Sequence, residues 1–308
     1  MRPRLPFLAA ILCLFCPIFA SAQSTTLAER LGYPRDAKLL ILHADDLAVA
    51  HSVDSASFDA LDSGLITSAS IMVPCPWLTE VADYAKTHPD ADLGLHLTLT
   101  SEWRKYRWGT VAPSDTVASL LDRLGTLWPD SPQFAQHAKP EDAEREIRAQ
   151  VERAIAAGIH PTHLDSHMLS LYATPEFFSV YAKVAHDYHL PFLAVRLPDH
   201  SDRTLSALTD KDIVLNSVII AAPGIPRDHW IDFYLNAIKG LQPGLSEIIV
   251  HLGHDDAALQ AITVGFDDYG SAWRQRDFEA INNPEFKKAL QENHIVLVKW
   301  KDLQKLVR

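Results

Sequence analysis

Acidic and histidine side chains gather in four short segments of this sequence, and such side chains can bind a metal ion or transfer protons. The segments contain Asp45-Asp46, His96, residues 162–167, and His251 with His254. Carboxylate oxygens and imidazole nitrogens form a mixed ligand set that suits a divalent ion with positions left open for water and substrate. In the adjacent pair Asp45-Asp46, one carboxylate can bind the ion while the other accepts a proton from water.

Each segment also has an ordinary structural interpretation. One aspartate of the pair can cap the following helix, a lone histidine is more often a hydrogen-bonded core residue, and residues 162–167 can form a polar turn. Around His96, however, leucines at every second position share one face of a predicted strand, and Gly94, His96 and Thr98 share the other. A polar strand face with a glycine beside the histidine favours a binding position.

The elements that must position these segments alternate between short apolar runs and helical stretches. We expect strands over residues 39–42, 68–73, 93–99, 163–165, 192–197, 213–220, 248–251 and 295–299. We expect helices over residues 53–61, 77–86, 140–158 and 175–189. Residues 101–138 are expected to be irregular, and a loop of that length is usually functional. Strands alternating with helices indicate a parallel sheet, and this number of repeats favours a single-domain α/β barrel over an open sheet.

All four polar segments fall at or just after the C-terminal ends of expected strands. In a (β/α) barrel the loops at that end converge on one site. Four such segments at the same end are much less common by chance than any one of them. The pattern therefore predicts one shared site, and it leaves open which carboxylates and histidines bind an ion there.

The N-terminal segment predicts export. Two arginines precede an apolar run over residues 5–19, and Ala20-Ser21-Ala22 then supplies a typical cleavage site. The run is shorter than the roughly 20 apolar residues of a membrane-spanning helix. We expect residues 1–22 to be a cleaved signal peptide and residues 23–308 to form the mature secreted or periplasmic domain, with no membrane association after cleavage.

The composition of the mature chain excludes some partners. It contains 26 basic and 39 acidic residues, a formal charge of −13, which argues against nucleic acid and anionic membranes. Cys75 is the only cysteine left after residue 22, so no internal disulfide can form and the fold must be stabilised by its hydrophobic core. These features do not determine the oligomeric state.

Taken in order, the motifs resemble those of the YdjC-like, or chitooligosaccharide deacetylase, family of carbohydrate deacetylases, which are related in architecture to polysaccharide deacetylases. The matching stretches are His43-Ala44-Asp45-Asp46, residues 64–70, residues 94–99, residues 161–167 and His251-Leu252-Gly253. The resemblance covers about residues 38–302. It implies an irregular TIM-like (β/α) barrel and an enzyme that removes the acetyl group from an N-acetylated sugar.

The resemblance also implies roles for individual residues. The counterparts of Asp46, His96 and His167 bind one divalent metal ion, for which magnesium and zinc are both compatible. Such an ion polarises the acetyl carbonyl and lowers the pKa of water. Asp45 matches the family's catalytic base, and His251, in its protonated form, matches the general acid that donates to the departing amine.

Further residues are expected to support the site. His163 or Asp165 would orient the ligand histidines, as outer partners of metal ligands usually do. Arg276 begins a late Arg-x-x-Glu motif and is expected to contact the ligands or the substrate. Aromatic residues between positions 103 and 108 can either stack on sugar rings or pack at the surface.

The sequence departs from the family pattern at three places. The Asp-Asp-Phe-Gly form ends here in Leu47-Ala48, and the His-Pro-Gly form contains Leu252 in place of proline. Leu169 stands where the family often has a histidine two residues after the last ligand. None of these changes removes an expected ligand, but the change at Leu169 alters the expected substrate subsite.

Two other classes of protein remain open at this point. A glycoside hydrolase on a similar barrel needs two carboxyl groups facing each other across the bond, roughly 5–9.5 Å apart, and the adjacent Asp45 and Asp46 do not obviously supply them. A non-catalytic exported sugar-binding protein needs aromatic and hydrogen-bonding residues but no set of metal ligands. Metal content after purification separates both from a deacetylase.

The expected cleavage site gives a first prediction. Signal peptidase cuts after a small residue that follows the apolar run, so the mature chain should begin at Gln23. Intact-mass spectrometry of the secreted protein measures this terminus. Active protein that still begins at Met1 would contradict it.

Overall fold

A curled parallel sheet forms the centre of the molecule. The computed structural model describes residues 25–195 and 204–307, so the expected signal peptide and the end of the expected strand over 192–197 lie outside the described residues. Within them, seven strands pair in the order β4-β3-β2-β1-β6-β5, with β7 also paired to β1, and every pair is parallel. The strands are β1 (Lys38–Leu47), β2 (Ser68–Ile71), β3 (Leu93–Leu97), β4 (Leu164–Ser166), β5 (Ser217–Ile220), β6 (Gly244–Val250) and β7 (Ile295–Leu297).

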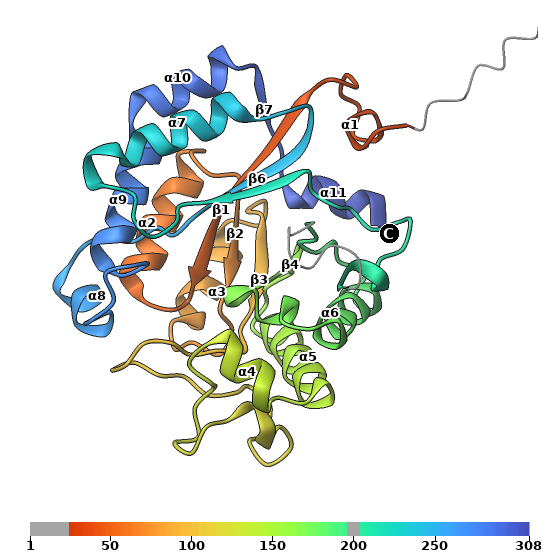
Figure 1. The fold of residues 1–308 in the computed structure, drawn as a ribbon, viewed down its shortest axis with the longest axis vertical. Coiled ribbons are helices and arrows are strands. Elements are labelled where there is room, and N and C mark those ends of the chain that lie inside the picture. The colour runs from red at the N-terminus through yellow and green to blue at the C-terminus, as the bar shows by residue number, and fades with distance from the viewer. Residues whose placement is uncertain (1–24, 196–203, 308) are drawn as a thin grey trace, which may run out of the picture.

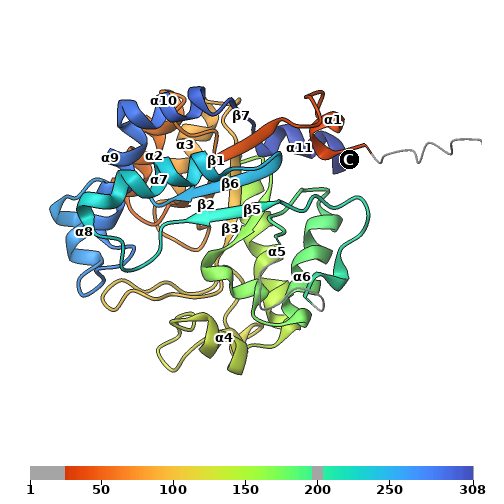
Figure 2. The ribbon, with the colours of Figure 1, turned by 45° about the horizontal axis from the view of Figure 1, so that its top comes forward.

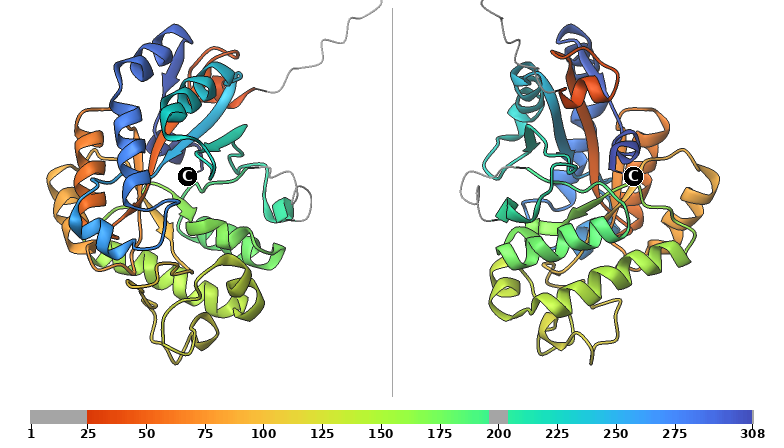
Figure 3. Two further views of the ribbon diagram at one scale, coloured as in Figure 1. Left: turned by 60° about the vertical axis from the view of Figure 1, so that its left-hand side comes forward. Right: turned by 90° about the vertical axis from the view of Figure 1, so that its right-hand side faces the viewer.

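Helices surround this sheet (Figures 1 and 3), most of them as an outer layer, whereas the first and last described helices contribute to the core on its inner face. They are α1 (Leu27–Arg30), α2 (His51–Asp62), α3 (Leu78–Thr87), α4 (Ser131–His137), α5 (Pro140–Ala156), α6 (Pro175–Asp187), α7 (Trp230–Gly240), α8 (Ala257–Ile262), α9 (Ser271–Asn282), α10 (Pro284–Glu292) and α11 (Trp300–Val307). None of the helices in the described part of the chain is both long enough and apolar enough to cross a membrane.

The two edge strands of the sheet approach each other through irregular chain. Phe192 forms a parallel bridge with Leu164 of β4, and Val195 forms one with Leu215, two residues before β5. Within residues 192–195, which are the described part of the expected strand over 192–197, the pairing consists of these isolated bridges and not of a continuous ladder. The result is a half-barrel of parallel strands with surrounding helices (Figure 2), which confirms the single-domain TIM-like architecture.

The strands bury two separate hydrophobic cores, one on each face. Leu40, Leu42 and Ala44 of β1 belong to the larger core, which packs the outer face of the sheet against the helices. Leu39 and Ile41 alternate with them and belong to a second core inside the barrel. This inner core also contains residues of β6, of the 213–215 segment and of α11, including Leu245, Ile213, Trp300 and Leu303. Apolar side chains therefore fill the N-terminal end of the barrel.

Toward the C-terminal ends of the strands, the side chains on the same inner face are polar. His43 and Asp45 continue the row that Leu39 and Ile41 begin, and all four are buried. On β3 the expected division of faces is confirmed, because its leucines join the outer core while His96 faces inward. The barrel interior is thus apolar at the N-terminal ends of the strands and polar at their C-terminal ends, which is where barrel sites form.

The long connection after β3 is more ordered than its sequence indicated. It contains the short helix α4, at whose start the Asp130 side chain accepts a hydrogen bond from the backbone N–H of Gln133. Pro132 occupies the first turn, where its missing N–H costs nothing. An aspartate cap followed by a proline is a helix-start signal, so the expectation of a wholly irregular 101–138 segment was wrong.

Gly94 supplies a test of how closely the inner face is packed. A Cβ atom at Gly94 would lie 2.3 Å from Cε1 of the buried His163 ring, so Gly94→Ala should lower the free energy of unfolding by about 1–3 kcal/mol. Gly240→Ala is the matched control, because a Cβ there meets nothing within 4 Å and the backbone needs no positive φ. Urea unfolding of both variants measures the difference, and equal stability of the two would contradict the packing argument.

Candidate active site

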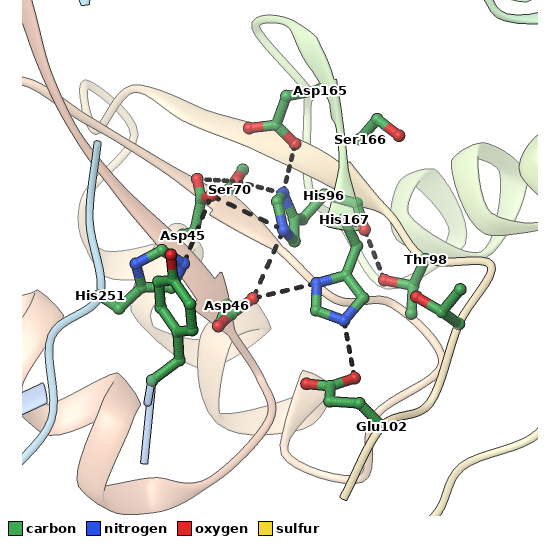
Figure 4. A network of polar contacts seen from close by, with 12 residues as sticks. Asp45, Asp46, Ser70, His96, Thr98, Glu102, Asp165, Ser166, His167 and His251 are labelled. Atoms are coloured by element: carbon green, nitrogen blue, oxygen red, sulfur yellow. Dashed lines mark hydrogen bonds and ion pairs between the residues drawn. The ribbon is translucent and has the colours of Figure 1, made fainter. Parts of the chain in front are cut away.

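An irregularity at the end of β1 points two adjacent carboxylates into the same space. Neighbouring residues of a regular strand face opposite sides, but the pairing of β1 with β2 shifts register between Ala44 and Leu47. Asp46 and Ala48 have φ values of 73° and 72°, in the left-handed region. This bend directs both Asp45 and Asp46 toward the polar end of the barrel (Figure 4). Ala48 stands where the family pattern has glycine, which would adopt this φ without strain.

Three ligand-type side chains converge beside the bend. Ligand atoms of Asp46, His96 and His167 all lie within 4.8 Å of one another, although they come from the ends of three different strands. His96 Nε2 and His167 Nδ1 each lie 3.4 Å from Asp46 Oδ1. The structure thus brings together the three residues that the sequence resemblance named.

Both histidines are held by a carboxylate on the nitrogen that faces away from Asp46. His96 Nδ1 lies 2.7 Å from Asp165 Oδ1, and His167 Nε2 lies 3.0 Å from Glu102 Oε2. A carboxylate accepts hydrogen bonds only, so each of these nitrogens carries the hydrogen. In the neutral form of each ring the lone pair is then directed at the space near Asp46, which is the tautomer that a metal ligand requires.

Arg274 of α9 fixes the third side chain of this group. Its Nη2 donates to Asp46 Oδ2 at 2.6 Å, and its Nε donates to the carbonyl of Tyr269 at 2.8 Å. Burial disfavours the charged form of Asp46, but the charge of Arg274 and contacts with His167 outweigh it and hold the pKa of Asp46 well below its usual range. Asp46 is therefore an ionised carboxylate with one oxygen occupied by Arg274.

The other oxygen of Asp46 makes this group fit a cation. Asp46 Oδ1 is buried and has no hydrogen-bond partner, although it faces two imidazole nitrogens. The carboxylates of Glu102 and Asp46 make the surrounding potential negative. Burial alone would lower the pKa of His167, but these two carboxylates outweigh it and raise the pKa to about 10. The same potential that favours a protonated imidazole favours a divalent cation, and one carboxylate with two histidines is a suitable ligand set.

Two overlapping groups of possible ligands fit a cation less well. They are His43 with His163 and Asp165, and Asp45 with His96 and Asp165. Their atoms already contact one another directly: His43 Nε2 lies 3.1 Å from Asp165 Oδ2, and His96 Nδ1 forms a 2.7 Å hydrogen bond with Asp165 Oδ1. Because these atoms satisfy one another directly, we assign the candidate metal centre to Asp46, His96 and His167.

Asp45 lies beside this centre and keeps one oxygen directed at it. Its Oδ1 lies 3.1 Å from His43 Nε2 and accepts a hydrogen bond from Ser70 Oγ at 3.4 Å. Its Oδ2 faces His96 Nε2 at 3.8 Å and His251 Nε2 at 3.9 Å (Figure 4). The carboxylate is therefore positioned from behind and has an oxygen free to receive a proton.

His251 follows β6 and faces Asp45 from the opposite side of the site. Its backbone N–H donates to Asp277 Oδ2 at 2.9 Å, and Asp277 also accepts from Trp230 and Tyr234. Burial lowers the pKa of the His251 ring to about 4 despite the nearby carboxylates. The ring is thus neutral near pH 7, so the protonated form expected from the sequence has to be produced during the reaction.

The remaining expected residues divide between the site and its surroundings. Asp165 orients His96, whereas His163 hydrogen-bonds to Thr162 and stacks on Trp300 at 4.9 Å. Of the expected pair, Asp165 therefore does the orienting. Arg276 lies over the Trp230 ring at 4.4 Å, and the contact with the ligand set is made by Arg274 in its place. This follows from helix geometry, because positions two apart on a helix face different directions.

Four supporting residues escaped the sequence reasoning. His43 contacts Asp45, and Glu102 contacts His167. Arg274 donates to Asp46, and Asp277 accepts from the backbone N–H of His251. The spacing of Arg274 and Asp277, three apart on one helix face, was an available signal.

Near the same site, Trp103 and Trp108 are buried, and Trp108 donates to the carbonyl of Thr100. Packing therefore describes these two rings better than an open sugar-stacking surface.

Fold and site together define a class of protein: a single-domain (β/α) barrel whose aspartate and histidine side chains meet at the C-terminal strand ends. The sequence profile described as "YdjC-like protein" matches residues 39–292. The chain belongs to the YdjC-like family.

Similar proteins agree with this assignment. A carbohydrate deacetylase of Thermus thermophilus is 32% identical over 278 residues, covering 87% of this chain and 95% of the relative. A chitooligosaccharide deacetylase of Yersinia enterocolitica is 28% identical, covering 83% of this chain and 95% of the relative. A solved structure from Enterococcus faecalis, 24% identical, superposes with a TM-score of 0.75 over 87% of this chain and 99% of the other, which supports the same fold.

The buried pair of Arg274 and Asp46 gives a stability prediction. Arg274→Met removes the cation but leaves the buried carboxylate, so the metal-free protein should lose about 3–5 kcal/mol of unfolding free energy. Arg276→Met removes only a partly exposed contact with aromatic rings and should cost about 1 kcal/mol or less. Chemical denaturation of both variants in the presence of a chelator measures the contrast. A larger loss in the Arg276 variant would reverse the assignment.

Proposed function

We propose that this protein is an exported, metal-dependent carbohydrate deacetylase that hydrolyses the N-acetyl group of an N-acetylated sugar or oligosaccharide. The observation that carries the proposal is the convergence of Asp46, His96 and His167 on one point, with Asp45 directly beside them. The relatives named carbohydrate deacetylase, which match over most of their length, support the substrate class and the bond.

The arrangement suits amide hydrolysis. A divalent ion held by Asp46, His96 and His167 would polarise the acetyl carbonyl and lower the pKa of water. Asp45 Oδ2 accepts a proton from the water as its oxygen bonds to the carbonyl carbon. His251, neutral at rest, takes up that proton from Asp45 and delivers it to the nitrogen as the carbon–nitrogen bond breaks. One hydrogen of water ends on the amine and the hydroxyl stays on the carbonyl carbon, so the products are the free amino sugar and acetic acid, which ionises to acetate.

The two alternatives explain these contacts less well. In a glycoside hydrolase the catalytic pair consists of two carboxyl groups on opposite sides of the bond, whereas here Asp46 is taken by Arg274 and by the two histidines. A sugar-binding protein without activity has no use for three ligand-type side chains whose outer atoms are each held by a partner. Neither alternative calls for His251 opposite Asp45.

Export completes the proposal. The basic start, apolar run and Ala20-Ser21-Ala22 of the sequence support a cleaved signal peptide. The acidic mature chain suits a neutral sugar better than nucleic acid or an anionic membrane. The enzyme would then act on N-acetylated sugars in the periplasm or outside the cell.

Acetate release tests the function directly. The purified mature chain is incubated with N-acetylated mono- and oligosaccharides, with added Zn²⁺ or Mg²⁺ and, in parallel, with EDTA. We expect acetate and free amine in equal amounts, loss of activity with EDTA, and its return when the ion is added back. Reducing ends formed without acetate would indicate a glycoside hydrolase, and no product with any substrate would indicate a binding protein.

The two adjacent aspartates should respond differently to the same substitution. Asp45→Asn preserves shape but removes the basic oxygen, so it should keep the metal and lower turnover by about 10²–10⁴, the usual contribution of a positioned acid–base group. Asp46→Asn weakens a ligand and should lose metal and turnover together. Paired metal analysis and acetate-release kinetics measure both. Metal loss in the Asp45 variant, or full turnover in it, would refute the division of roles.

A further inference from the structure

A buried histidine behind the candidate site contacts both the proposed catalytic base and the carboxylate that holds a proposed metal ligand. His43 lies two residues before Asp45 on β1 and therefore faces the same way. Its Nε2 lies 3.1 Å from Asp45 Oδ1, 3.1 Å from Asp165 Oδ2 and 3.0 Å from Ser70 Oγ. One imidazole nitrogen thus contacts carboxylates from β1 and from the three-residue strand β4.

The direction of these hydrogen bonds follows from their chemistry. Ionised carboxylates can only accept, so the hydrogen is on His43 Nε2, where one N–H faces Ser70 Oγ at 3.0 Å and is flanked by the carboxylates of Asp45 and Asp165, each 3.1 Å away. Each carboxylate uses its second oxygen for the proposed reaction: Asp165 Oδ1 holds the ligand His96, and Asp45 Oδ2 is the oxygen proposed to accept the proton. A shift of His43 would therefore displace the base and a metal ligand at the same time.

The surroundings leave His43 little freedom to move. The residue is fully buried, and the His163 ring lies edge-on to it with centroids 5.1 Å apart. Its Nδ1 has no hydrogen-bond partner and lies 3.8 Å from Glu247 Oε1. The other donor to Asp45 Oδ1 is the Ser70 hydroxyl, at the longer distance of 3.4 Å. His43 is therefore the closest donor that holds Asp45 from behind.

We propose that His43 is a positioning residue whose Nε2–H fixes the base Asp45 and, through Asp165, the ligand His96 in one geometry. The inference rests on the proposed deacetylase function for the role of Asp45. Its structural part, one N–H flanked by two carboxylates, stands independently of that function. His43 itself need not touch the substrate or the ion.

Two substitutions distinguish a role of His43 as a hydrogen-bond donor from a role as a ring that only fills space. His43→Gln places an amide N–H at a reach similar to that of Nε2, whereas His43→Leu fills similar space with no donor. We expect His43→Leu to lower kcat about 10–100-fold with KM changed less than about threefold, and His43→Gln to recover kcat to within about fivefold of wild type. Equal losses in both variants, or no loss in the leucine variant, would overturn the proposal.

Two measurements do not depend on turnover. The Zn²⁺ affinity of the metal-free protein, measured by competition with a chelator, should fall about tenfold in His43→Leu and less than threefold in His43→Gln. In the ¹H–¹⁵N spectrum of metal-free protein, one slowly exchanging imidazole N–H signal should be present in wild type and missing from both variants, while the signals of His96 and His167 stay. If no imidazole N–H signal of the wild type is lost in both variants, the His43 N–H contact is overturned.

A core substitution controls for general loss of stability. Phe178→Leu changes a buried aromatic residue of α6 that packs against the rings of Tyr172, Tyr181 and Phe192. It should lower the thermal midpoint while kcat and Zn²⁺ affinity stay at wild-type values. If Phe178→Leu lowers kcat as much as His43→Leu at a similar midpoint, His43 is only structural. Wild-type protein that shows the imidazole signal but releases no acetate would refute the deacetylase proposal and leave the positioning contact intact.

Discussion

Burial of acidic groups at one end of the barrel is the constraint on which this structure depends. Five carboxylates there are at most 6% exposed: Asp45, Asp46, Asp165, Glu247 and Asp277. An ionised carboxylate removed from water costs several kcal/mol unless charges or hydrogen bonds compensate it. Arg274 neutralises Asp46, His43 lies between Asp45 and Asp165, and Asp277 accepts three hydrogen bonds. Glu247 accepts one from Trp300, and burial raises its pKa to about 7.

One buried carboxylate oxygen in this group lacks a hydrogen-bond partner, and it lies where the proposed metal ion would bind. Asp46 Oδ1 stays without a hydrogen-bond partner while the inner nitrogens of His96 and His167 are turned toward it. The outer nitrogens of both rings are fixed by carboxylates, so the inner ones do not have to reorganise when a cation arrives. A site whose side chains are held from behind in this way would be preorganised for the cation and for the amide hydrolysis that we propose.

Both the parallel strands and the long connection after β3 contribute side chains to this site. Parallel strands place their C-terminal ends at one level, so residues from β1, β3, β4 and β6 meet there. A regular β1 would separate Asp45 from Asp46, and only the register shift with left-handed Asp46 lets both face inward. The connection after β3 then contributes Glu102, which holds His167 from the solvent side. Local backbone strain of this kind persists where surrounding packing fixes it, and it is commonly found at functional sites.

The sequence by itself determined the parts of this protein that depend on local periodicity. Alternation of residues along 93–99 assigned His96 to the polar face of its strand, alternation of strands with helices indicated the barrel, and the polar segments after the strands indicated the end that carries the site. The tertiary structure decided which side chains meet across the barrel, because those contacts join residues distant in the chain: Asp46 and Arg274 are 228 positions apart, and Glu102 and His167 are 65 apart. Neither the choice of Arg274 over Arg276 nor the hydrogen bond from His43 to Asp165 follows from spacing alone. Both depend on the angle at which α9 packs and on the curl that brings β4 to β1, and these are set by packing of the whole core.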